Sequence, residues 1–127
     1  MTENPYQQEA QDRWGETDAY KESAKRLNNY SAEDIEMAKK EMGEATLLIL
    51  DAMLAGLSPD SPEAMLGAEA HRSSISNWWY ECNYEMHTGL ASMYLVDERF
   101  SEYYEKIHPG LAQYVHDAIY ANAIANS

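Results

Sequence analysis

The segment of residues 71–100 holds most of the side chains in this chain that could do chemistry. It contains two Trp, three Tyr, one Phe, two His and the only Cys within thirty residues. Imidazoles, thiols and phenols are the groups from which acid–base, nucleophilic and metal sites are built. The same rings also form either an aromatic core or the wall of a pocket for a bulky ligand. The function depends on which of these the fold makes.

The spacing of these groups does not favour catalysis or metal binding. His71 and His87 lie sixteen residues apart, and neither has a second metal ligand three or four positions away. Cys82 is close to His87 in sequence, but no third orienting group can be placed, and no nucleophile elbow surrounds a Ser. Glu81 and Glu85 are interpreted as solvated acids in an acidic chain. We therefore expect no catalytic residue, no metal and no cofactor, and a protein that is not an enzyme.

The charge balance and the cysteine count limit the partners. Nine Lys and Arg against 22 Asp and Glu give a net charge of −13, which is unfavourable for nucleic acid, anionic membranes and anionic ligands. A lone Cys allows no internal disulfide and no Cys-rich zinc site, and burial is its commoner state. The longest apolar run, residues 46–50, is too short for a bilayer, and no signal peptide follows Met1. These features predict a cytoplasmic protein.

Helical periodicity predicts an all-α domain over residues 1–127, because Val, Ile and Thr never alternate over a strand-length window. Residues 1–29 are thinly apolar and form an arm with two short helices, at about 5–14 and 18–28, whose order depends on a partner. The core, residues 30–127, starts at a capping box on Ser31. Its five main helices are predicted at about 31–56, 62–78, 84–96, 97–107 and 111–125.

Helical spacing decides which side chains of residues 71–100 share a face. Tyr84, His87, Leu90, Ala91 and Tyr94 fall on one face of the 84–96 helix. The preceding helix aligns His71, Ile75 and Trp78 or Trp79. If these faces meet, they enclose either a ligand cavity with polar tips or a core whose Tyr and Trp groups are satisfied locally. Both interpretations remain open at this point.

Three stretches of this chain resemble the TipAS antibiotic-recognition domain family. They are residues 71–100, with an aromatic-Tyr-x-Cys segment, Tyr-Glu-Met-His and Met-Tyr-x-x-Asp-Glu-Arg-Phe, then the tail PGLAQYVHDAIYANA and the early RWGETDAYKES. The resemblance implies a globin-like all-α fold without haem. It also implies recognition of large, hydrophobic, multi-ring peptide antibiotics, thiopeptides above all. In the family this domain is the C-terminal effector half of some MerR-type regulators, and it also occurs alone, where it sequesters the drug. The N-terminal arm is expected to fold over the ligand.

Two departures from the family refine these expectations. We find no helix-turn-helix segment, so we expect no nucleic-acid contact by this chain itself, with any MerR-type DNA-binding half lying in a longer protein. The family cysteine that attacks a dehydroalanine of the drug matches Gly89, which has no nucleophile. Cys82 matches another family cysteine. It shares a face with Gly89 only on a continuous helix, and it substitutes only if it is exposed with a lowered pKa.

We therefore expect non-covalent binding of a bulky, thiopeptide-like antibiotic, for sequestration or as an effector domain. Residues 97–99 are interpreted as a helix start with a local ion pair. One alternative is a protein-interaction module with a flat, exposed aromatic patch. Another is a haem or metal protein, suggested only by the implied globin-like fold and the His content. The expected ligand contacts are Trp78, Trp79, Tyr80, Tyr84, His71, His87, Leu90, Met93 and Tyr94 in the core, with Trp14 and Tyr20 from the arm.

Overall fold

The structure, a computed structural model, describes residues 17–127, and within them it has six α-helices and no strand. The five main helices and the second arm helix lie where the sequence predicts them. The predicted helix at 5–14, with Trp14, lies outside the described residues. The helices are α2 (Asp18–Asn28), α3 (Ala32–Leu54), α4 (Pro62–Trp78), α5 (Tyr84–Val96), α6 (Glu98–Ile107) and α7 (Leu111–Ala125).

Local capping explains where the helices begin. Ser31 Oγ accepts from the Asp34 backbone N–H at 3.1 Å, and the Asp34 carboxylate accepts from the Ser31 N–H at 2.9 Å, which completes the predicted capping box. Ser61 caps α4, with Pro62 as the first helical residue. Asp97 caps α6 and pairs with Arg99 at 2.9 Å, as expected for a helix start with a local ion pair.

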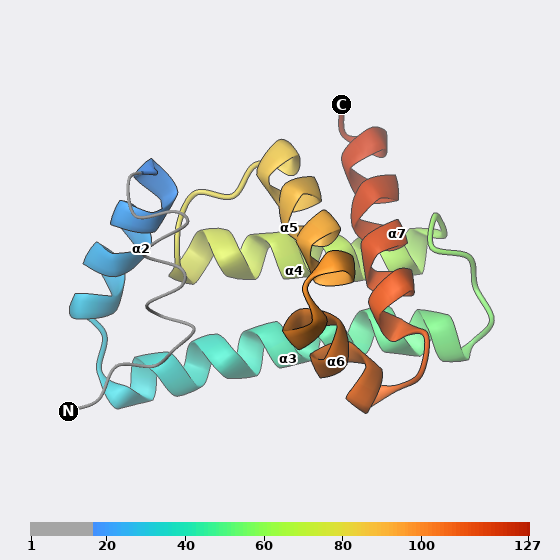
Figure 1. Cartoon of the computed structure of the whole chain (residues 1–127), viewed down its shortest axis with the longest axis horizontal. Helices are drawn as coiled ribbons and strands as arrows, with labels where there is room; N and C mark the ends of the chain where they lie inside the picture. The colour runs from blue at the N-terminus through green and yellow to red at the C-terminus, as the bar shows by residue number, and fades with distance from the viewer. Residues whose placement is uncertain (1–16) are drawn as a thin grey trace.

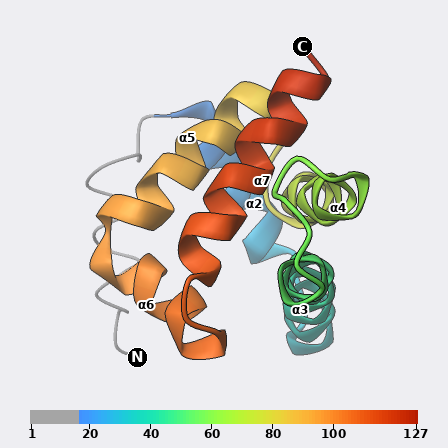
Figure 2. The same ribbon diagram turned by 90° about the vertical axis from the view of Figure 1, so that its right-hand side faces the viewer.

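The helices are arranged as two crossed pairs. α3 and α4 run lengthwise and antiparallel, while α5 and α7 lie side by side across them, with α6 at one end (Figures 1 and 2). Gly67 allows α3 and α4 to approach closely: a Cβ at this position would lie 2.7 Å from Ile49 Cγ1 and 2.9 Å from the Ile49 backbone N. α7 packs against both helices of this long pair, and α5 and α6 pack against α7 and against each other.

The core lies where α7 crosses α3 and α4. The α7 side chains Leu111, Val115 and Ile119 are fully buried, as is Ile49 on α3. Half of the buried apolar side chains among the described residues are Ala, and they come from α3, α4, α5 and α7. Small side chains at these crossings let the helix backbones come close together.

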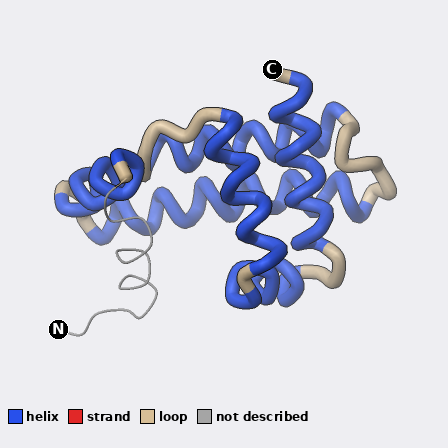
Figure 3. The backbone as a smooth tube through the Cα atoms, turned by 45° about the horizontal axis from the view of Figure 1, so that its top comes forward, coloured by secondary structure: helices blue, strands red, loops and turns tan. Residues whose placement is uncertain are grey.

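α2 lies beside the C-terminal end of α4, away from α7 (Figures 1 and 3). None of its residues is buried, in keeping with its thin apolar content. Arg26 Nη1 donates to the Ser76 carbonyl at 2.7 Å, and the hydroxyl of Tyr30, in the α2–α3 linker, donates to the Trp78 carbonyl. These bonds satisfy carbonyls that the end of a helix leaves open. Within residues 17–127, none of the helices has the length and apolar character to cross a membrane.

Candidate ligand-binding site

Of the side chains that the sequence aligns on α4, His71 reaches the aligned face of α5, where its imidazole bonds directly to that of His87. His71 Nδ1 and His87 Nε2 are 3.0 Å apart, and His71 Nε2 lies 3.2 Å from the Tyr104 hydroxyl of α6. Both imidazoles are fully buried. Burial lowers the pKa of His71 to about 4 and that of His87 to about 3, so both rings are neutral at pH 7. We call His71, His87 and Tyr104 the histidine chain.

One atom of the histidine chain is unsatisfied. Among the described residues, the buried His87 Nδ1 has no hydrogen-bond partner. If His87 Nε2–H donates to His71 Nδ1, and His71 Nε2–H donates to Tyr104, the orphan atom is a bare acceptor. The opposite direction would leave a buried N–H without an acceptor, which is the rarer situation in proteins. We therefore assign the first direction, which leaves His87 Nδ1 as an acceptor without a donor.

The indoles gather at the C-terminal end of α4. The Tyr30 ring meets Trp78 at 5.6 Å and Trp79 at 6.1 Å between centroids, both edge-on. Trp78 Nε1–H donates to Glu41 Oε2 of α3 at 3.1 Å. Tyr80 is half-buried, and burial raises its pKa to about 12. The two indoles and Tyr80 thus retain partial exposure, and Tyr20 on α2 is also half-buried.

Cys82 lies in the segment of residues 79–83 between α4 and α5, which we call the α4–α5 segment. The predicted burial is confirmed: the thiol side chain is fully inaccessible, and burial raises its pKa to about 11. α5 begins at Tyr84, with Asn83 as its N-cap, so Cys82 is outside the helix. The continuous helix that Cys82 would need in order to share a face with the exposed Gly89 is therefore not formed, as the predicted helix bounds of 62–78 and 84–96 require.

The remaining expected contacts on α5 point in different directions. Tyr94 is buried beside Tyr104, with ring centroids 5.3 Å apart. Leu90 packs against the core, and Met93 is half-buried. Tyr84 covers the Arg72 guanidinium at 4.3 Å. Tyr84 also lines a surface groove of about 360 Å³ between α5 and α7, with Glu85, Thr88, Tyr120, Ala123, Ile124 and Ser127.

The expected site residues thus fall into three places. One is the histidine chain with Tyr94, the second is the aromatic end of α4, and the third is the Tyr84 side of α5. Sequence reasoning missed Tyr104, whose partners lie on other helices. It also missed Asn122, a buried polar residue that continues the apolar stripe of Val115 and Ile119; a polar side chain on such a stripe signals a specific partner. Among residues 17–127, no group of three or more His, Cys, Asp or Glu is arranged to hold a metal ion.

Comparisons with known proteins place this arrangement in a family. The model of the TipAS antibiotic-recognition domain matches residues 6–122. The HTH-type transcriptional activator TipA of Streptomyces coelicolor is 43% identical over 122 residues, which cover 96% of this chain and 48% of TipA. The chain spans about half the length of the curated TipA relatives that it matches.

Two solved structures share the fold. The TipAS structure from Streptomyces lividans in complex with nosiheptide is 43% identical and superposes with a TM-score of 0.89, covering 96% of this chain and 85% of that chain. The antibiotic-binding domain of a TipA-class multidrug resistance regulator is 44% identical with a TM-score of 0.65, covering 71% and 96%. The expected all-α, globin-like fold is confirmed. This chain belongs to the TipAS antibiotic-recognition domain family.

Proposed function

We propose that this domain binds bulky, multi-ring, thiopeptide-like antibiotics without forming a covalent bond. The observation that carries the proposal is the TM-score of 0.89 and 43% identity, over 96% of the chain, to a TipAS structure solved in complex with nosiheptide. The proposed activity is binding, with no chemical step. A net charge of −13 also suits a neutral or cationic ligand better than an anionic one.

The half-buried rings are the first contacts that we propose. Trp79 and Tyr80 in the α4–α5 segment, Tyr20 on α2 and Met93 on α5 each keep part of their surface exposed. Aromatic rings of this kind stack on the heterocycles of a multi-ring ligand. Partial burial also favours a ligand site over the alternative, an interaction module, which would present these rings on a flat, exposed patch.

The imidazoles contribute only if the interface between α4 and α5 opens. His71 and His87 are fully buried, so a ligand reaches the His87 Nδ1 acceptor only after the side chains around it move. We propose that Tyr hydroxyls orient the ligand first, and that a ligand donor group fills the open position on His87 in the bound state. Because an unsatisfied buried acceptor is unfavourable, this bond would add affinity.

Non-covalent capture follows from the state of the one thiol. Cysteine reacts as the thiolate, and Cys82 is inaccessible with a pKa raised to about 11 by burial. The position where the family resemblance places a reactive cysteine is Gly89, which is exposed. A Cβ at Gly89 would meet nothing within 4 Å, so a side chain fits there without strain.

Titration with nosiheptide tests binding and covalency together. We expect quenched Trp fluorescence, a raised melting temperature and an unmodified protein mass after incubation. Gly89→Cys should give a protein heavier by one nosiheptide, and Gly89→Ser is its matched control without a thiol. An antibiotic-sized adduct on the native chain would overturn non-covalent capture. Unchanged fluorescence and melting across a small thiopeptide panel would refute ligand binding.

The biological setting is a separate part of the proposal. The matched relatives are transcriptional activators about twice as long as this chain. We propose that the domain serves either as the effector of a MerR-type regulator or as a sequestering protein. The coding sequence upstream of this chain decides between them, since a regulator requires an adjoining DNA-binding half.

A further inference from the structure

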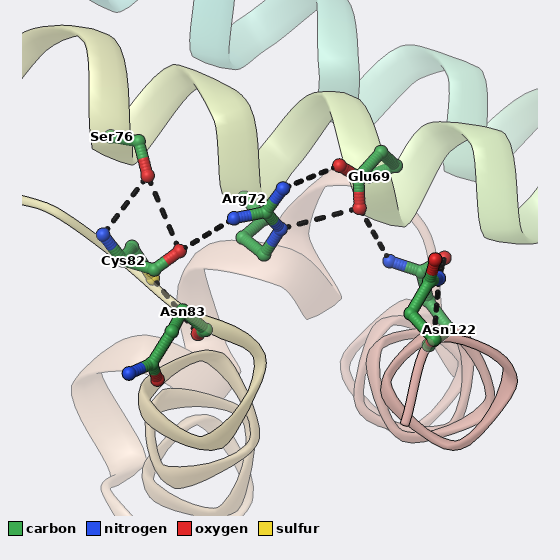
Figure 4. Close-up of polar contacts among 7 residues, drawn as sticks. Glu69, Arg72, Ser76, Cys82, Asn83 and Asn122 are labelled. Carbon is green, nitrogen blue, oxygen red and sulfur yellow. Dashed lines mark hydrogen bonds and ion pairs between the residues drawn. The ribbon is translucent and has the colours of Figure 1, made fainter.

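A single guanidinium, that of Arg72 on α4, connects four parts of the domain. Its Nη1–H donates to the Cys82 carbonyl at 2.7 Å, and the ring of Tyr84 on α5 lies 4.3 Å from it. On its other side, Nε and Nη2 donate to the two oxygens of Glu69 at 3.2 and 2.5 Å (Figure 4). Glu69 in turn accepts from Asn122 Nδ2 of α7 at 3.0 Å. Paired, charged hydrogen bonds of this type hold a side chain in one geometry.

The electrostatics agree with a fixed cation. Hydrogen bonding to Arg72, with smaller contributions from Asn122 and Tyr84, holds the pKa of Glu69 below its usual range against the opposing effect of burial. The same carboxylate raises the pKa of Arg72. Both side chains are only partly exposed, at 19% for Arg72 and 35% for Glu69. The ion pair is therefore less open to solvent than a surface pair that salt would screen.

Side chains of α4 bind both the backbone N–H and the backbone carbonyl of Cys82. Ser76 Oγ accepts from the Cys82 N–H at 2.9 Å and donates to the Cys82 carbonyl at 3.2 Å, beside the bond from Arg72. We call Glu69, Arg72, Ser76 and Asn122 the Cys82 clamp. Trp79 and Tyr80 at the start of the segment are bonded too, since both backbone N–H groups donate to the Ile75 carbonyl. The non-helical segment is thus tied to α4 at its start and near its end.

We propose that Arg72 is a positioning residue of the antibiotic site, which fixes the α4–α5 segment so that Trp79 and Tyr80 are in place before the ligand arrives. The inference rests on the proposed function, because it takes these two rings as ligand contacts. Ordering a backbone residue on binding costs conformational entropy, which weakens affinity. A segment fixed in the free protein avoids that loss, which is the general advantage of preorganisation. Arg72 itself need not touch the ligand.

The test compares two clamp variants with a core variant. Arg72→Met keeps the aliphatic stem and removes the cation, and Ser76→Ala removes the second anchor without leaving an unpaired charge. The control, Ile119→Val, lowers stability at a fully buried α7 position outside the clamp. Two quantities are measured on the full chain: the exchange rate of the Cys82 amide by NMR in free protein, and the Kd for nosiheptide by calorimetry. The Cys82 N–H bonds to Ser76 rather than Arg72, so its faster exchange in Arg72→Met reports movement of the segment.

We expect Arg72→Met to speed Cys82 amide exchange and to weaken nosiheptide binding about tenfold, the order expected when about one further backbone residue must be ordered on binding. Ser76→Ala should weaken binding in the same direction, and Ile119→Val should change neither quantity. Unchanged exchange in Arg72→Met overturns the positioning role, whatever the affinity. The positioning role is also overturned if Arg72→Met speeds Cys82 amide exchange but binds nosiheptide with the same Kd as Ile119→Val. If the native chain does not bind nosiheptide, the proposed function fails, and the Cys82 exchange rate alone then decides whether the clamp holds the segment.

Discussion

Acid should destabilise this domain through the histidine chain, and the direction follows from the pKa values. In the folded state burial lowers the pKa of His71 to about 4 and that of His87 to about 3, whereas an unfolded His titrates near 6.5. At pH values between the folded and unfolded pKa, the histidines are protonated in the unfolded chain but not in the folded protein. The stability that the two neutral histidines contribute is therefore fully present above about pH 6.5 and is lost progressively as the pH falls below that value.

The magnitude can be worked out for a change from pH 7 to pH 5. For each pH unit below the unfolded pKa of about 6.5, a histidine that stays neutral in the folded protein lowers the free energy of unfolding by about 1.4 kcal/mol. At pH 5 each histidine therefore lowers it by about 2 kcal/mol, and the pair by about 4 kcal/mol. His87→Gln removes one titrating group, while its amide N–H can still donate to His71 Nδ1. We expect this variant to lose about 2 kcal/mol less than the native protein over the same interval.

Urea unfolding at pH 7 and pH 5, followed by Trp fluorescence, measures this difference. Carboxylates such as Glu69 and Glu105 titrate in both proteins and cancel in the comparison. His108→Gln is the matched control, because His108 lies in the turn before α7, outside the histidine chain. It should keep the native pH dependence. Equal losses in His87→Gln and the native protein would refute the argument that buried, neutral imidazoles govern the acid sensitivity.

Three further predictions concern packing, capping and the thiol. Gly67→Ala should lower the free energy of unfolding by about 2 kcal/mol or more, because its Cβ meets the Ile49 backbone. Gly43→Ala, with open space around it in α3, should raise that free energy by up to about 1 kcal/mol. Equal urea midpoints for the two variants would contradict the packing argument. Ser31→Ala removes the capping box of α3 and should cost about 1 kcal/mol, read from the melting temperature, with no loss indicating that water replaces the cap. Cys82 should resist a thiol reagent such as dithionitrobenzoate in native buffer and react fully in urea, and rapid native labelling would show that the buried state is not dominant.

The helix bounds could be predicted from the sequence because the residues that start and end each helix lie next to it in the chain. Ser31, Ser61 and Asp97 are each followed by the helix that they cap, and Gly110, at φ +87°, precedes α7 in a conformation that glycine adopts readily. Apolar spacing also placed His87, Ala91 and Tyr94 on the buried face of α5. Caps and periodicity both act within one or two helical turns, so a single sequence reveals them.

The sequence was not sufficient for contacts between helices. The partners of His71 lie sixteen and 33 residues away, and they meet only because α4, α5 and α6 all pack against α7 at particular angles. From the sequence Arg72 is an ordinary surface cation. In the fold its partner Glu69 also accepts a hydrogen bond from Asn122 of α7, 53 residues away in the chain. Such contacts depend on crossing geometry, which side-chain spacing along one helix does not determine.

The alanine-rich core has a consequence for how the chain uses its larger side chains. An alanine loses no rotamer freedom on burial, so close helix crossings are obtained without freezing long side chains. Among the described residues alanine makes up half of the buried apolar side chains, while Trp78, Trp79, Tyr80 and Met93 remain only partly enclosed. Mutations at Trp79, Tyr80 or Met93 are therefore expected to leave the helix crossings largely intact, whereas Trp78 also bonds to Glu41 of α3. Because Trp79, Tyr80 and Met93 are also the ligand contacts that we propose, they are the natural positions for engineering a new specificity.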